Sequence, residues 1–260
     1  MTWGSADLNR DPATRDAVRG TPIPAQEQDH MASKTVLITG ATSGIGAHTA
    51  RSLLARGHRV VVTGRDERKL EKFLDEAGCP DRLLGLVGDA ADWQATDSVV
   101  TRAVEHFGGL DAAVANAGFM SGDSIGAGDP ALWAPMVLTN VLGPALLAHA
   151  SLPHLEAAGG RLVLIGSVAG LKNSPGNLYS ATKWATTGLA ENVRLHATAR
   201  GVGVTLVNPG MVDTPFWEGT GVPPFALPPR PVAETICFAL DQPAGVDLNT
   251  LTIRPVGQPV

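Results

Sequence analysis

Hydrophobic and polar positions follow a regular rhythm from Thr35 to the end of the chain. Short apolar runs rich in β-branched residues alternate with amphipathic stretches of helical length. The runs are continuously apolar, which is typical of strands buried on both faces of a parallel sheet. The seven predicted strands cover residues 35–39, 58–63, 82–87, 110–116, 161–167, 202–208 and 250–254. The pattern therefore predicts a single α/β domain with a doubly wound, seven-stranded parallel sheet.

The segments between these strands carry recognisable helix ends. Asp129 and Pro130 fit an N-cap followed by a proline in the first turn, and Gly201 fits the end of a long helix. Pro144 lies inside the apolar segment 130–157 and should kink the helix predicted there.

The first 30 residues break the rhythm. They are polar, punctuated by proline and glycine, and show no apolar periodicity. We expect residues 1–30 to form a mobile extension outside the fold, and residues 31–260 to form the domain.

Composition and charge narrow the class of protein. The chain of 260 residues is 44% hydrophobic and 17% charged, which is ordinary for a globular protein. Its net charge of −5 argues against non-specific nucleic-acid binding, and no run approaches the roughly 18 apolar residues of a membrane span. Two distant cysteines and scattered histidines indicate neither a disulfide framework nor a metal site. We expect a reduced, cytoplasmic protein without metal, nucleic-acid or membrane partners.

A glycine-rich turn follows the first predicted strand and leads into a helix. The segment from Thr39 to Gly46 reads TGATSGIG, with glycines at positions 40, 44 and 46. In such a turn, backbone N–H groups and the helix N-terminus can hold a pyrophosphate. Glycine turns also serve packing alone, but one that opens a series of βα units indicates a dinucleotide site.

The end of the second predicted strand bears on the choice of dinucleotide. An acidic residue that binds ribose is expected about 20 residues beyond the glycines, but Gly64 stands there and Arg65 follows. A guanidinium can hold a 2′-phosphate through two parallel hydrogen bonds, which favours NADP(H). The alternative is a solvated loop arginine, with Asp66 capping the next helix.

Three residues indicate proton chemistry. Tyr179 is the single tyrosine of the chain, and Lys183 follows it by four residues on a predicted helix. Positions i and i+4 share a helix face, so the ammonium group can lower the pKa of the phenol. Ser167 ends a predicted strand, where the sites of open α/β sheets lie. Each feature alone often serves packing, but together they predict a site that exchanges a proton with a substrate.

The motifs together resemble those of the short-chain dehydrogenase/reductase family over about residues 33–256. Its TGxxxGIG turn corresponds to residues 39–46, its acid after the third strand to Asp89, and its PG motif to Pro209 and Gly210. Its NNAG motif corresponds to residues 115–118, with Ala115 in place of the first asparagine. The resemblance implies a Rossmann-type fold and NADP(H)-dependent hydride transfer between nicotinamide and a carbonyl or secondary alcohol.

The resemblance also implies a role for each matched residue. Tyr179 would exchange a proton with the substrate oxygen, Ser167 would hydrogen-bond that oxygen, and Lys183 would bind the nicotinamide ribose. Asn140, in Thr-Asn-Val, would hold a water that links Lys183 to solvent. The implied dinucleotide-binding residues are Gly40, Thr42, Ser43, Gly44, Ile45, Gly46, Arg65, Asp89, Ala90, Asn116, Ala117, Gly118, Tyr179, Lys183, Pro209, Gly210, Val212 and Thr214.

The segment at about 215–230 corresponds to the substrate loop of the family. Phe216 and Trp217 predict an apolar substrate pocket, unless they only anchor the loop on the core. The resemblance further implies a homotetramer formed through the apolar segment 137–155 and the helix after Asn177.

Two other functions remain open for such a chain. A non-catalytic dinucleotide sensor would usually lack the tyrosine or the lysine, and an epimerase or dehydratase would usually carry a larger C-terminal domain.

Overall fold

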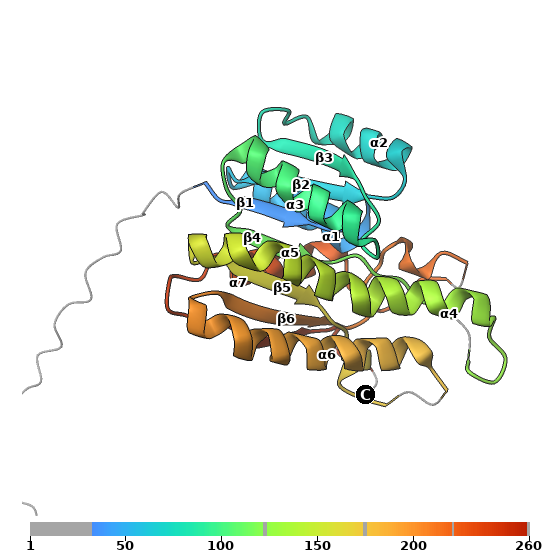
Figure 1. Ribbon diagram of the computed structural model, residues 1–260. Coiled ribbons are helices and arrows are strands. Elements are labelled where there is room, and N and C mark those ends of the chain that lie inside the picture. The colour runs from blue at the N-terminus through green and yellow to red at the C-terminus, as the bar shows by residue number, and fades with distance from the viewer. Residues whose placement is uncertain (1–32, 122–123, 174–175, 220, 259–260) are drawn as a thin grey trace, which may run out of the picture. The chain divides into compact units, whose positions relative to one another are not determined.

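Seven short apolar segments form one parallel sheet in the order β3-β2-β1-β4-β5-β6-β7 (Figure 1). The strands are β1 (Thr35–Ile38), β2 (Arg59–Gly64), β3 (Leu83–Val87), β4 (Ala112–Ala115), β5 (Arg161–Ile165), β6 (Gly203–Pro209) and β7 (Thr250–Ile253). Each strand overlaps the segment in which the sequence predicts it. The predicted doubly wound, Rossmann-type sheet is therefore confirmed.

The structure is a computed structural model that describes residues 33–121, 124–173, 176–219 and 221–258. The extension predicted over residues 1–30 lies outside the described residues. That domain boundary stays a prediction.

Helices connect the strands and cover both faces of the sheet (Figure 1). They are α1 (Gly44–Ala55), α2 (Glu67–Ala77), α3 (Trp93–Phe107), α4 (Pro130–Val137), α5 (Gly143–Ala158), α6 (Leu178–Ala197) and α7 (Pro229–Leu240). One core cluster joins the sheet to α1, α2 and α7, and a second joins it to α3, α5 and α6. In β1, Val36 and Ile38 belong to the first cluster and Leu37 to the second. Both faces are buried, which is why the strand is continuously apolar.

The helix ends that the sequence predicts are present in the structure, and side-chain hydrogen bonds cap the helix starts. The carboxylate of Asp129 accepts from the N–H of Ala131 at 2.9 Å, and Pro130 opens α4. Asn177 caps α6 in the same way through the N–H of Ser180, at 3.0 Å. A short 3₁₀ turn, η3 (Thr198–Arg200), extends α6 until Gly201, which has a φ of 80°. Polar N-caps and a left-handed glycine thus set the boundaries.

A π-helical turn, η1 (Leu138–Leu142), separates α4 from α5. Pro144 has no N–H group, so the carbonyl of Asn140 lacks the donor that an α-helix would supply four residues later. The hydroxyl of Thr186 on α6 lies 3.1 Å from that carbonyl, and the N–H of Gly143 donates to the carbonyl of Leu138. The sequence predicts a kink at Pro144, and the structure has an irregular turn that precedes Pro144 and contains Asn140.

One helical segment in the described part of the chain, residues 130–158, is long and apolar enough to be a candidate membrane span. The core helix of a soluble protein passes the same test of length and composition. In α5, Leu147, Ala148 and Leu155 are buried in the core cluster beside the sheet. We therefore assign the segment to the helical layer of a soluble-type fold.

Candidate active site

A cavity of about 710 Å³ lies beyond the carboxyl ends of the central strands, where the strand order reverses between β1 and β4. It joins the glycine turn to the residues predicted for proton chemistry. The predicted site residues that line it are Gly40, Thr42, Ser43, Gly44, Ile45, Arg65, Asp89, Ala90, Asn116, Ala117, Gly118, Ser167, Tyr179, Lys183, Pro209, Gly210, Val212 and Thr214. Gly46 and Asn140 are not among the lining residues.

The glycine turn presents bare backbone to the cavity. Gly40 and Gly44 have φ values of 63° and 54°, a conformation that side chains strongly disfavour. Ser43, the N-cap of α1, makes no side-chain capping bond, and the first turn of α1 contains no acidic residue. The first N–H groups of α1 therefore remain for an anion such as a pyrophosphate, whose charge the helix N-terminus favours.

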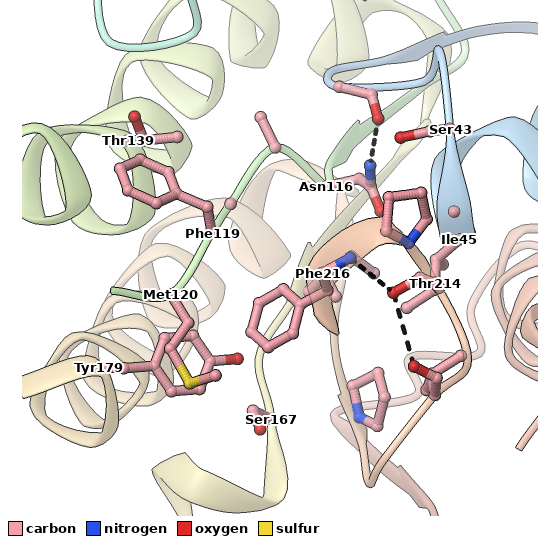
Figure 2. Close-up of a pocket in the computed structure, with 18 of the residues that line it drawn as sticks. Ser43, Ile45, Asn116, Phe119, Met120, Thr139, Ser167, Tyr179, Thr214 and Phe216 are labelled. Atoms are coloured by element: carbon pink, nitrogen blue, oxygen red, sulfur yellow. Dashed lines mark hydrogen bonds between the residues drawn. The ribbon is translucent and has the colours of Figure 1, made fainter. Parts of the chain in front are cut away.

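Gly46 lies behind the glycine turn, where the absence of a side chain allows a neighbouring residue to pack closely. A Cβ at this position would lie 2.5 Å from the amide nitrogen of Asn116. That side-chain amide donates to the carbonyls of Thr39 and Gly40, at 2.9 Å each. Figure 2 shows one hydrogen bond of the Asn116 side chain. Asn116 thus braces the glycine turn from β4, and Gly46 leaves room for it.

Charged side chains gather at the end of the cavity that β2 and β3 form. The guanidinium of Arg65 is 62% exposed and lies 3.8 Å from the carboxylate of Asp89, a long and weak ion pair. Asp66 caps α2 by accepting from the N–H of Lys69 at 3.1 Å, as the alternative interpretation of this segment expected. Lys69 also lines the cavity, and no motif pointed to it.

Ser167 follows β5 and caps a short 3₁₀ turn, η2 (Val168–Gly170). Its Oγ accepts from the N–H of Ala169 at 3.1 Å. Because the oxygen accepts there, the hydroxyl hydrogen is left to donate elsewhere. The side chain of Ser167 lies near that of Tyr179 (Figure 2), and it acts on the pKa of the phenol.

Tyr179 and Lys183 share a face of α6, as their spacing predicts. The ring of Tyr179 is partly exposed to the cavity, but the protein surrounds its hydroxyl, and this burial raises the pKa of Tyr179 to about 12. The hydrogen bond with Ser167 acts in the opposite direction and is outweighed. Burial also lowers the pKa of Lys183 to about 8.

The predicted lowering of the Tyr179 pKa is therefore wrong for this structure. The Nζ atom of Lys183 donates to the carbonyl of Ile165 at 2.9 Å and lies 5.7 Å from the centroid of the Tyr179 ring. Its charge thus does not offset the loss of solvent around the phenol.

Asn140 is buried behind the cavity wall. Its amide pairs with both backbone groups of Phe119, at 3.0 and 2.9 Å, and donates to the hydroxyl of Thr182 at 3.1 Å. Gly118 lies between it and Lys183, since a Cβ there would be 3.1 Å from the Asn140 Oδ1 and 3.7 Å from the lysine Nζ. In this structure, the side chain of Asn140 holds a wall segment in place.

Apolar side chains form the end of the cavity beside Tyr179. Phe216, in the 3₁₀ turn η4 (Pro215–Trp217), packs edge-on against Tyr179 with ring centroids 5.5 Å apart (Figure 2). Trp217 packs against Phe216 and donates from its indole nitrogen to the carbonyl of Val212 at 2.8 Å. Trp217 thus anchors the loop, as one interpretation expected, while Phe216 also reaches Tyr179.

Other lining residues were not predicted from the sequence. Phe119 and Met120 come directly after the Ala-Asn-Ala-Gly motif, and Thr139 directly precedes Asn140. Their positions next to these motifs are the sequence feature from which they could have been predicted. Gln258 reaches the cavity from the C-terminal segment, where its Oε1 accepts from the N–H of Met211 at 3.1 Å, and no sequence pattern indicates this.

Comparison with known families defines the class of protein. The model of the short chain dehydrogenase family matches residues 34–221. The chain therefore belongs to the short-chain dehydrogenase/reductase family, whose members are oxidoreductases that bind a nicotinamide dinucleotide and act on small molecules.

Individual relatives agree with this assignment. An uncharacterized oxidoreductase of Staphylococcus epidermidis is 32% identical over 226 residues, which cover 86% of this chain and 97% of the relative. Another, from Staphylococcus saprophyticus, is 34% identical over 233 residues, covering 87% of this chain and 99% of the relative.

Two solved structures are also similar. An alcohol dehydrogenase from Thermococcus sibiricus, complexed with 5-hydroxy-NADP, is 27% identical, has a TM-score of 0.81, and matches 88% of this chain and 99% of its own. A 3-ketoacyl-(acyl-carrier-protein) reductase from Brucella melitensis, complexed with NADH, is 25% identical with a TM-score of 0.76, and the match covers 85% and 96% of the two chains.

Proposed function

We propose that this chain is an NADP(H)-dependent reductase or dehydrogenase that acts on a carbonyl or secondary alcohol with an apolar body. One observation carries the proposal: Ser167, Tyr179 and Lys183 line the same cavity as the glycine turn. The apolar wall beside Tyr179, which includes Met120 and Phe216, supports the substrate class.

A dinucleotide held at the glycine turn would supply the hydride, and the chain's own residues would bind and protonate the substrate oxygen. The hydroxyl of Ser167 donates a hydrogen bond to that oxygen, where negative charge develops during reduction. The phenol of Tyr179, protonated at neutral pH because burial raises its pKa to about 12, delivers the proton that completes the alcohol. Lys183, whose pKa burial lowers to about 8, would hold the nicotinamide ribose and would supply the proton that restores the phenol of Tyr179.

The preference for NADP(H) rests on Arg65. Its ion pair with Asp89 is long and exposed, so a 2′-phosphate can replace it at little cost. Lys69 adds a second cation at the same end of the cavity.

Turnover of the nicotinamide tests the proposal directly. The purified protein is mixed with NADPH or NADH and a panel of aldehydes and ketones, and the nicotinamide absorbance is followed. We expect oxidation of NADPH with apolar carbonyl substrates, and its loss in Tyr179→Phe. Binding of NADPH without turnover of any substrate or alcohol would favour a sensor, while conversion of substrate without net change in the dinucleotide would favour an epimerase or dehydratase.

We further propose that the protein acts in the cytoplasm as a homotetramer. Support for an interface comes from exposed apolar side chains on the two helices that the family uses for assembly. They are Leu132, Val137, Leu138 and Leu142 along α4 to α5, and Trp184 and Leu195 on α6. Light scattering at micromolar concentration tests this, and a monomeric mass would contradict it.

A further inference from the structure

The side chain of Asn208, near the end of β6, is fully buried directly beneath the site. Its Oδ1 atom accepts a hydrogen bond from the backbone N–H of Ser167 at 3.0 Å. Its Nδ2 atom has no hydrogen-bond partner among the described residues. The hydrogen bond that the Asn208 side chain makes among the described residues therefore holds the backbone of Ser167.

A buried amide with an unpaired donor is unfavourable for stability. An apolar side chain of similar size, such as leucine, would avoid that cost at this position. Positions where a chain retains such a cost are more often functional than structural. Because the one hydrogen-bond partner of the Asn208 side chain among the described residues is Ser167, we relate the retained cost to Ser167.

The backbone around Ser167 is built to receive this amide. A Cβ at Gly166 would lie 2.1 Å from the Asn208 Oδ1, so no side chain fits there. The N–H of Gly166 donates to the carbonyl of Val207 at 2.8 Å, which ties the segment to β6. One residue earlier, the carbonyl of Ile165 accepts from Lys183. At the end of β5, Ile165 thus contacts Lys183, and the next two residues, Gly166 and Ser167, both bond to β6.

The direction of the Ser167 hydroxyl depends on this backbone. Ser167 is extended, with φ −172° and ψ 157°, and its Oγ accepts from the N–H of Ala169. If the Ser167 amide rotates, the oxygen loses that donor, and the hydroxyl hydrogen is no longer directed by it.

We propose that Asn208 is a positioning residue for the reaction: its carboxamide holds the Ser167 amide so that the Ser167 hydroxyl meets the substrate oxygen. Asn208 does not line the cavity, so it acts through Ser167 rather than by touching the substrate or the dinucleotide. The inference rests on the proposed oxidoreductase function.

The first experiment compares Asn208→Leu with the wild type and with Asn192→Leu. Leucine has a similar size but cannot accept the hydrogen bond, and Asn192 is an exposed asparagine on α6 that bonds a single backbone carbonyl. We expect kcat of Asn208→Leu to fall about 10- to 100-fold, as misplacement of a catalytic group does. The dissociation constant for NADPH and all parameters of Asn192→Leu should stay within about twofold. A kcat within about twofold of the wild type in Asn208→Leu would overturn the inference.

A double-mutant cycle separates positioning from a general structural role. If Asn208 acts through Ser167, adding Asn208→Leu to Ser167→Ala should cause no further loss of kcat. If the two losses multiply, Asn208 acts independently and the inference fails. Should the leucine variant not fold, Asn208→Ala takes its place in the same cycle.

A measurement without turnover completes the test. Hydrogen exchange of the Ser167 amide should become faster in Asn208→Leu than in the wild type and in Asn192→Leu. Unchanged protection of that amide would overturn the inference. A wild-type protein that oxidises no nicotinamide with any substrate would instead contradict the proposed function, which keeps the two failures distinct.

Discussion

The two ends of the sheet both bury ionisable groups, but they treat them differently. At the amino end, each buried cation finds defined partners: Arg161 donates to the carbonyls of Gln242, Pro243 and Val246, at 2.8 to 2.9 Å. The Nζ atom of Lys34 donates to the carbonyl of Leu240, and its backbone N–H donates to the ring of His58 at 3.1 Å. At the carboxyl end, Tyr179 and Lys183 face a cavity. Burial shifts pKa values at both ends, since it lowers those of Arg161 and Lys183 and raises that of Tyr179. Satisfied groups stabilise the fold, whereas groups left facing a cavity are available for chemistry.

The largest expected effect lies at the carboxyl end. Replacing Tyr179 with phenylalanine removes the proton donor while the ring can still pack on Phe216. We expect kcat to fall about 100- to 10,000-fold, with NADPH binding and thermal stability nearly unchanged. Steady-state kinetics and calorimetry measure both. Substantial remaining turnover would mean that the proton comes from another group.

At the amino end of the sheet, we expect a substitution to lower the stability and to leave kcat nearly unchanged. Arg161→Met leaves three carbonyls without their donor, so the free energy of unfolding should fall by about 3 kcal/mol. Denaturant titration measures this change, and kcat of the folded variant should stay close to that of the wild type. A large loss of kcat with unchanged stability would break the contrast between the two ends.

The buried Lys183 should make stability depend on pH. Its pKa of about 8 is below the unfolded value of 10.5, so the folded state binds fewer protons between these pH values. Stability from this group therefore rises with pH from about 8 to 10.5, and the unfavourable burial of the charge is fully present below pH 8. Lys183→Met should be more stable than the wild type by about 3 kcal/mol at pH 7, and this advantage should vanish near pH 10.5. Urea titrations across that range test it, and a constant difference would contradict it.

The smallest of these effects concerns Arg65. Loss of a charge-assisted phosphate contact costs about 1.5–3 kcal/mol, which is roughly 10- to 150-fold in affinity. Arg65→Ala should weaken NADPH binding by that factor and leave NADH binding nearly unchanged. Lys69→Ala should give a weaker effect of the same kind. Equal losses for the two dinucleotides in a binding titration would place the 2′-phosphate elsewhere.

The elements that follow local rules were predictable from the sequence. Gly40 and Gly44 need left-handed backbone, and the strands are apolar on both faces, so residue types alone indicated them. The tyrosine and lysine share a helix face by spacing alone.

The other features of the site depend on tertiary packing, which the sequence patterns do not reveal. Gly46 and Asn140 match family motifs, yet the fold places them behind the cavity wall, where they pack against Asn116 and Phe119. Gln258 reaches the cavity from the C-terminal segment of the chain, and a local sequence pattern cannot predict such a long-range contact. The pKa of Tyr179 depends on how closely the protein surrounds the hydroxyl, and the ammonium of Lys183, whose spacing predicted a lowered pKa, does not offset this burial.

The π-helical turn η1 changes the rotational phase of the helix that contains it. Each α-helical residue turns the chain by about 100°, so one extra residue in a turn rotates everything beyond it by about that angle. Met136 before the turn and Leu147 after it are both buried, although they belong to two helical phases. Pro144 cannot supply an N–H to the carbonyl of Asn140, which favours the irregular turn, and regular α-helix resumes with α5 at Gly143. The segment 130–158 therefore stays helical throughout, but its buried face shifts around the helix axis at η1.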